Sequence, residues 1–151
     1  MVLSALLKSN WFGVEVVKFK GHQNIQATHP TTFEITKENY LTKRGDCIVG
    51  VSADKSLSDF SSVFKKLVRK DGSTLVIVIA VKGVGHDIVI AKGSQNLSYS
   101  DETRIIVRKS AYTSPNTAGI HATKAAADLD RTLIHGLKEG KEGVAVFIIY
   151  R

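Results

Sequence analysis

The chain has 151 residues, of which 43% are hydrophobic, and this length and composition fit one ordinary domain with a real core. A single cysteine, Cys47, excludes an intramolecular disulfide framework and a zinc cluster of several thiolates, and its apolar surroundings predict a buried, inert thiol. The net charge of +7 favours polyanionic partners such as RNA, DNA or acidic protein, although a lysine-rich soluble surface explains it equally well.

The first half of the chain predicts a short extension followed by strands and one helix. Residues 1–12 form the extension, and residues 13–151 form a single domain. Alternating or apolar runs predict strands over 14–20, 24–28, 31–36 and 47–52, with Gly21-His22 at a turn. A buried stripe at helical spacing predicts a helix over 55–69, with Asp54 as its N-cap.

The second half predicts five more strands and a second helix. The strands are expected over 74–81, 87–92, 103–109, 117–122 and 144–150, and the helix over 125–135. The last strand has no further unit after it and is expected to pair back on the first half. About nine strands and two helices predict an α+β fold with a largely antiparallel, curved or barrel-like sheet, against which both helices pack.

Three short motifs occur twice in the same order. The pattern G-x-x-A-x-K-x-x-x-D begins at Gly50 and again at Gly119, an offset of 119 − 50 = 69. Residues 35–40 match residues 107–112, and Gly21-His22 matches Gly85-His86. The repetition predicts an internal duplication, with one copy in 13–72, the other in 73–151, and a pseudo-twofold axis between them.

The motifs also resemble a family of small archaeal proteins, domain of unknown function 371. The resemblance rests on Gly21-His22-x-Asn24, on the run from Lys37 to Lys55, and on the run from Lys124 to Arg131, and it covers residue 14 to the C-terminus. It implies an archaeal cytoplasmic protein of the fold class above. It brings no established reaction; a nuclease label attached to the family is a hypothesis to test on these residues.

The doubled polar residues predict an anion site. Lys55 and Lys124 fall in the first turn of each predicted helix, where a lysine opposes the helix dipole and so calls for a ligand or a tertiary partner. Helix N–H groups beside a lysine are a typical phosphate site. The expected ligand-binding residues are His22, Lys37, Lys55, His86, Lys109 and Lys124. The alternative is structural: turn histidines and surface salt bridges.

Three carboxylates of the first half have no counterpart in the second and suggest catalysis. Glu34, Asp46 and Asp54 could together hold Mg²⁺ and activate water in an endonuclease, with Lys55 nearby. Asp54 as an N-cap and Asp46 as a turn residue are the structural alternatives. The five histidines show no zinc spacing, so no other cofactor is expected.

The sequence therefore favours a module that binds the phosphate backbone of RNA or DNA. A Mg²⁺-dependent endonuclease and a module for a phosphorylated small molecule remain as alternatives. The N-terminus shows no basic leader, and no apolar stretch reaches membrane-spanning length, so we expect a cytoplasmic protein without a membrane partner. The oligomeric state is left open.

Overall fold

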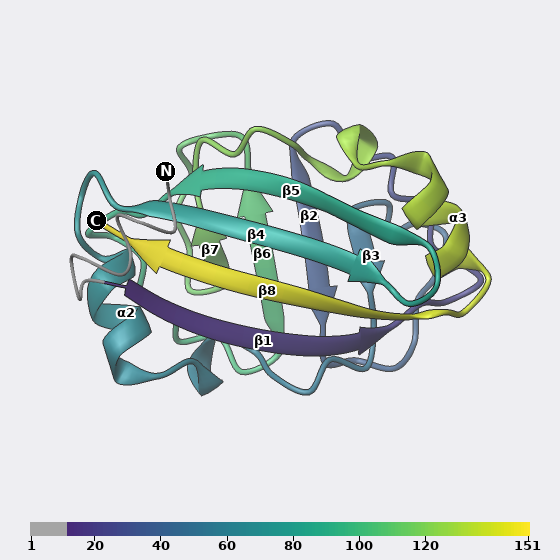
Figure 1. Ribbon diagram of the computed structural model, residues 1–151, viewed down its shortest axis with the longest axis horizontal. Helices are drawn as coiled ribbons and strands as arrows, with labels where there is room; N and C mark the ends of the chain where they lie inside the picture. The colour runs from purple at the N-terminus through teal and green to yellow at the C-terminus, as the bar shows by residue number, and fades with distance from the viewer. Residues whose placement is uncertain (1–11) are drawn as a thin grey trace.

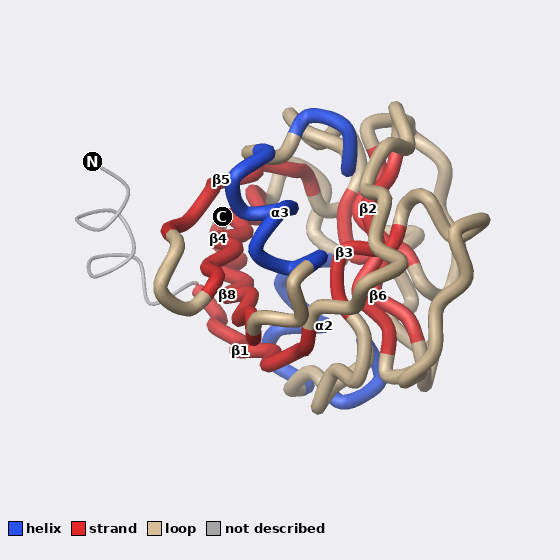
Figure 2. Tube along the Cα trace, turned by 90° about the vertical axis from the view of Figure 1, so that its right-hand side faces the viewer, coloured by secondary structure: helices blue, strands red, loops and turns tan. Residues whose placement is uncertain are grey.

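Two four-stranded sheets lie face to face in the structure, a computed structural model that describes residues 12–151 (Figures 1 and 2). The first sheet has the order β1-β8-β4-β5, made of β1 (Phe12–Lys20), β4 (Thr74–Val81), β5 (Gly85–Lys92) and β8 (Glu142–Tyr150). The second has the order β3-β2-β6-β7, made of β2 (Thr32–Thr36), β3 (Ile48–Gly50), β6 (Arg104–Arg108) and β7 (Thr117–Gly119).

The first sheet is antiparallel throughout, and β8 lies inside it. β8 pairs with β1 on one side and with β4 on the other, which confirms that the last strand returns to the first half of the chain. Alternate residues of these strands are buried, so one face of the sheet points into the core and the other points outward.

The second sheet combines an antiparallel centre with parallel edges. β2 pairs antiparallel with β6. β3 runs parallel to β2, and β7 runs parallel to β6, each with one register irregularity. The prediction of an α+β fold with mostly antiparallel sheets is confirmed. In the described residues the sheets do not close into a barrel. The first sheet is joined to the chain that follows β3 and β7 only by two isolated bridges, Lys20↔Val51 and Lys92↔Ile120.

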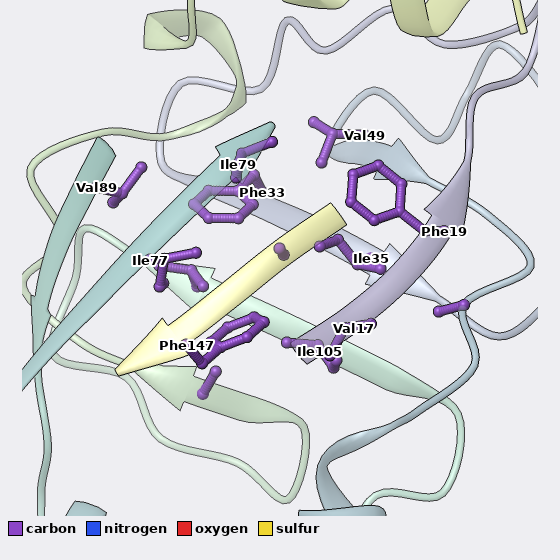
Figure 3. Packing of buried hydrophobic residues seen from close by; sticks show 14 of the residues in the cluster. Val17, Phe19, Phe33, Ile35, Val49, Ile77, Ile79, Val89, Ile105 and Phe147 are labelled. Atoms are coloured by element: carbon purple, nitrogen blue, oxygen red, sulfur yellow. The ribbon is translucent and has the colours of Figure 1, made fainter. Parts of the chain in front are cut away.

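The core lies between the two sheets. Phe33 and Ile35 of β2 point towards the inner residues of the first sheet, among them Phe19, Ile77 and Phe147 (Figure 3). All five side chains are at most 2% exposed. Burying apolar surface of this kind contributes about 25 cal/mol per Å² and holds the sheets together.

Two short helices pack against the sheets near the two ends of the molecule (Figure 1). α2 (Ser62–Val68) packs on β1 and β8, and α3 (Arg131–Lys138) packs on β4 and β5 of the first sheet and on β3 of the second. Each is preceded by a single 3-10 turn, η1 (Leu57–Asp59) and η2 (Ala126–Asp128). None of the helices in residues 12–151 is long and apolar enough to cross a membrane.

Both predicted helices begin too early, and the predicted N-cap is wrong. Asp59 binds the Ser56 N–H through its carboxylate, and the chain is extended at Phe60 before Ser61 caps α2. Asp54 instead accepts a hydrogen bond from the Lys18 N–H of β1. Helical periodicity continues through the 3-10 turn, so the break cannot be recognised from the pattern of apolar residues.

The described residues contain eight strands, where nine were expected. Residues 24–28 are not a strand: Ala27 has a φ of 50°, a left-handed conformation that a strand cannot contain. The expected extension over residues 1–12 lies outside the described residues except for Phe12, which is the first residue of β1.

Candidate functional site

Lys55 and Lys124 each bind a carboxylate of the first sheet. Lys55 Nζ lies 3.0 Å from Glu15 Oε1, and the other Glu15 oxygen accepts a hydrogen bond from the Ser61 N–H at the start of α2, at 2.6 Å. Lys124 Nζ donates to Asp87 Oδ1 in the same way. The anion expected beside each helix start is therefore present, but it is a carboxylate of the protein itself.

Asp87 also holds the start of α3. Its Oδ2 accepts a hydrogen bond from the Asp130 N–H at 2.8 Å, and its Oδ1 accepts one from the Ile88 N–H. Burial raises the pKa of Asp87, but the bonds from Lys124 and the two backbone N–H groups outweigh it, so the pKa lies below its ordinary value. The carboxylate is ionised at neutral pH and partners Lys124.

Lys37 and Lys109 are paired with the aspartates of the 3-10 turns. Lys37 Nζ lies 2.8 Å from Asp59 Oδ2, and Lys109 Nζ lies 2.7 Å from Asp128 Oδ2. The hydrogen bond from each lysine lowers the pKa of its aspartate. These lysines are more than a third exposed, so solvent weakens the pairs and leaves the ammonium groups accessible.

The two histidines make none of the ion pairs formed by these four lysines. His22 turns the chain after β1, where its Nδ1 accepts a hydrogen bond from the Asn24 N–H. His86 is exposed on β5, opposite Ala80 of β4. A shared role of His22 and His86 with the four lysines stays a prediction.

The structure separates Asp54 from the other two carboxylates singled out for catalysis. Glu34 lies on β2 of the second sheet, and Asp46 lies two residues before β3 in the same sheet. The Asp54 carboxylate accepts a hydrogen bond from the Lys18 N–H of β1, an edge strand of the first sheet. Across residues 12–151, no three side chains of His, Cys, Asp or Glu are grouped so that they could hold a metal ion. The geometry gives the three-carboxylate site no support.

Glu34 is nonetheless an unusual residue. It is 4% exposed, and its Oε2 has no hydrogen-bond partner, although Arg104 Nε approaches to 3.8 Å. Burial is the main reason why the pKa of Glu34 is raised. The neighbouring Cys47 donates to Glu34 Oε1, and burial raises the pKa of this thiol to about 11, which makes it a poor nucleophile at neutral pH.

Two loops run beside the second sheet, on the side that faces away from the first (Figure 2). We call these segments, residues 37–47 and 109–116, the loop layer. They carry Tyr40 and Tyr112, which are 65% and 63% exposed and are the most exposed large hydrophobic side chains in the described chain. An exposed tyrosine ring offers an apolar face to a partner while its hydroxyl stays in water.

One arginine of β6 lies against Tyr112, and the other is linked to Tyr40 through a glutamate. The Arg108 guanidinium lies 4.9 Å from the centre of the Tyr112 ring and donates to neutral oxygens of Ser114, Asn116 and Thr117. Glu38 links Arg104 to Tyr40, because its carboxylate accepts from both. Among the described residues no carboxylate pairs with Arg108, so its positive charge is uncompensated there.

Sequence reasoning missed both arginines. The tyrosines stood out because they repeat, whereas Arg104 lies outside the repeated motifs and Arg108, although it lies within residues 107–112, aligns with Thr36 and is not itself repeated. The available signal was the position of Arg104 and Arg108 at the two ends of an apolar run, four residues apart, which places both side chains on the same face of a strand.

A groove of about 620 Å³ lies at one end of the first sheet. Its walls carry three lysines, Lys18, Lys20 and Lys82, and two carboxylates, Asp54 and Glu142. Its lining also includes the apolar residues Ala80 and Val144, together with Gly143. Volume and lining fit a small ligand that has an anionic group and an apolar part.

The comparisons with known proteins agree with the resemblance seen in the sequence. The model of the family described as "Domain of unknown function (DUF371)" matches residues 17–150. An uncharacterised protein of Methanocaldococcus jannaschii is 44% identical over 134 residues, which cover 89% of this chain and 98% of the relative. The chain therefore belongs to the domain of unknown function 371 family.

Proposed function

We propose that this protein binds RNA or DNA through the loop layer and the two arginines beneath it. The observation that carries the proposal is the pair of exposed rings, of which Tyr112 lies against Arg108 and Tyr40 is linked to Arg104 through Glu38. A base has an apolar face that stacks on tyrosine, and a phosphate takes the fork of a guanidinium. The two groups together match a nucleotide better than either does alone.

The charge of the loop layer supports an anionic ligand. Lys43 and Arg44 are exposed on the first loop, and Arg108 carries an uncompensated charge beneath the second. Lys37 and Lys109 begin the two loops and keep accessible ammonium groups in their exposed pairs. A phosphate backbone crossing the layer would meet positive charge from both loops.

Lys55 and Lys124 take a different part in this proposal. Each neutralises a carboxylate that is about 10% exposed, so they hold the starts of the helices in place rather than meeting the ligand. This divides the predicted lysines into an inner structural pair and an outer pair available to phosphate. The involvement of His22 and His86 remains a prediction.

The test is fluorescence anisotropy with labelled single-stranded RNA and DNA at low and high salt. Phosphate contacts predict binding that weakens steeply with salt. Because stacking of one base on an aromatic ring contributes about 1–3 kcal/mol, Tyr40→Ala and Tyr112→Ala should each weaken binding about tenfold. Tyr150→Ala, on the opposite sheet, is the matched control and should leave the affinity unchanged. Equal affinity in all three variants would refute the site, and no binding at low salt would refute the function.

The endonuclease alternative is tested in the same samples. Incubation with Mg²⁺ followed by gel analysis of the nucleic acid would reveal cleavage. If a metal site includes Asp46, then Asp46→Asn abolishes metal-dependent cleavage and leaves binding intact. Intact nucleic acid at every Mg²⁺ concentration would remove this alternative.

The groove favours a second candidate, a phosphorylated small molecule. The three lysines would bind its phosphate, and the apolar residues of the lining would contact its apolar part. A thermal-shift screen of phosphorylated metabolites tests this candidate, since a ligand that binds only the folded state raises the melting temperature. Lys20→Met should abolish the shift, whereas Lys43→Met, a lysine of the loop layer, should not.

We also infer that the chain is a duplicated unit, and the strand register supports this. Adding 72 to β1 and β2 residues gives the positions of β5 and β6, and subtracting 68 from β8 residues gives those of β4. The pair Lys20↔Glu142 then becomes Lys92↔Thr74, and Thr32↔Arg108 becomes Arg104↔Thr36, both of which occur. This register aligns Gly21 with Gly93 rather than with Gly85.

Left-handed residues give the duplication independent support. Ala27 and Tyr99, 72 positions apart, have φ values of 50° and 52°. Ser52 and His121, 69 positions apart, both have a φ of 52°. Four non-glycine residues in this conformation, falling into two matched pairs, are best explained by two copies of one backbone.

A further inference from the structure

The outer face of the first sheet carries two complete rows of valine and isoleucine. Cross-strand pairing places Val14, Ile148, Val76 and Ile90 in one row. It places Val16, Val146, Val78 and Ile88 in the next. We call these eight residues the valine–isoleucine face. On a sheet face open to water, polar residues normally occupy such positions.

This face lacks a cover in the described part of the chain. Figure 1 looks onto the first sheet, and α2 and α3 lie at its two ends rather than across it. The edge-strand members Val14, Val16, Ile88 and Ile90 are 40–49% exposed. The four members on β4 and β8 are partly exposed as well.

The valine–isoleucine face and the next row on each side together are large enough for a stable contact between proteins. With strands about 4.8 Å apart and residues about 3.3 Å apart, the two rows of the face span about 19 Å by 13 Å, and with one flanking row on each side the area is about 19 Å by 26 Å, or about 500 Å². Two such areas in contact remove about 1,000 Å² in plan, the level at which specific interfaces begin. The interdigitation of side chains increases the accessible area that is buried.

The surroundings of the face resemble the rim of an interface. One flanking row contains Lys18, Val144, Ala80 and His86. The other contains Phe12, Tyr150, Thr74 and Lys92. An apolar centre without charges inside a mixed rim is the usual composition of a homodimer interface.

A lipid surface fits less well as the cover. A lipid-binding surface is usually rich in aromatic residues, whereas the eight central residues are all β-branched aliphatics, which pack well between stacked sheets.

We propose that the valine–isoleucine face binds the same face of a second copy, so that the protein is a homodimer with a four-layer stack of sheets. A twofold axis through the face lets each row meet its equivalent in the partner. Each copy carries a net charge of +7, so the copies repel at long range. Added salt should therefore strengthen the dimer, the reverse of its effect on nucleic-acid binding.

Sedimentation equilibrium of the full chain tests the proposal. A dimer of the 16.4 kDa chain is expected, with a population that grows with concentration and salt. Val16→Glu and Ile90→Glu are made separately. Each would bury one carboxylate from each copy and should raise the dissociation constant about 100-fold or more. Ile88→Thr is a milder variant that keeps strand propensity and should raise it about tenfold. Val63→Glu, at an exposed valine of α2, is the matched control and should leave it unchanged.

Circular dichroism confirms that each variant is folded. A monomer at every concentration overturns the proposal, and so does a dimer that Val16→Glu, Ile90→Glu and Ile88→Thr all leave intact. A monomer in which Lys8 cross-links to Lys18 or Lys92 within one chain would instead identify the N-terminal segment as the cover. A monomer that sediments with vesicles of phosphatidylcholine and phosphatidylserine would identify a lipid surface, and this too overturns the proposal.

Discussion

Glu15→Gln tests whether the inner lysine pairs are structural. In the native protein the two Glu15 oxygens accept from Lys55 Nζ at 3.0 Å and from the Ser61 N–H at 2.6 Å. Glutamine has nearly the same shape, but only one of its two polar atoms can accept a hydrogen bond. The substitution therefore removes the charge and leaves one donor without its acceptor, although the structure around it need not move.

The magnitude follows from these contacts. A hydrogen bond to a charged group contributes about 1.5–3 kcal/mol, and Lys55 is a third exposed, so water recovers part of its loss. We expect the free energy of unfolding to fall by about 2 kcal/mol. In a chain of this size that lowers the melting temperature by about 4–8 °C.

Thermal and urea unfolding followed by circular dichroism measure this change. Glu102→Gln, the same chemical change at an exposed glutamate, is the control and should stay within about 0.5 kcal/mol of the native protein. In a double-mutant cycle with Lys55→Met, the two substitutions should be non-additive by about 1 kcal/mol. Equal effects of Glu15→Gln and Glu102→Gln would refute the structural role assigned to this pair.

Three further predictions follow from the geometry. Lys37→Met breaks an exposed pair and should cost less than about 1 kcal/mol in urea unfolding; a larger loss would mean that the pair is structural after all. Burial raises the pKa of Glu34, so ionisation of this carboxyl costs stability once the pH rises above its pKa in the unfolded chain. Glu34→Gln should therefore be more stable than the native protein near pH 8 but not near pH 4. A stability difference that does not change with pH would contradict this. Gly21→Ala would drive its Cβ into the Leu137 carbonyl oxygen and should destabilise by about 2 kcal/mol or more, whereas Gly13→Ala, whose nearest contact is a side chain at 3.2 Å, should cost less.

Much of the fold could be predicted because the strand signals are local. The run Thr74–Val81 is a strand with the bounds that its apolar pattern predicts, and the returning strand Glu142–Tyr150 begins only two residues earlier than expected. The breaks before α2 and α3 could not be predicted. They depend on Glu15 and Asp87, which approach Ser61 and Asp130 from 46 and 43 residues away in the sequence.

The candidate site shows the same division. The repeated motif singled out Lys55 and Lys124. Their carboxylate partners lie on β1 and β5, and sequence spacing does not reveal such long-range pairs. The outer face of the first sheet was missed for a different reason. The outward-facing residues of its strands are nearly all apolar. A strand that is apolar on both faces has the same sequence pattern whether its outer face is exposed or buried, and Val76 and Val78 are compatible with both situations.

The most direct test of the proposed function is a ¹⁵N–¹H chemical-shift titration with a short single-stranded RNA. We expect the shifts to concentrate on the loop layer, at Tyr40 and Tyr112, and on the backbone of β6 around Arg108. Shifts confined to Lys18, Lys20 and Lys82 would move the binding site to the groove on the first sheet. An unchanged spectrum at low salt would contradict nucleic-acid binding itself.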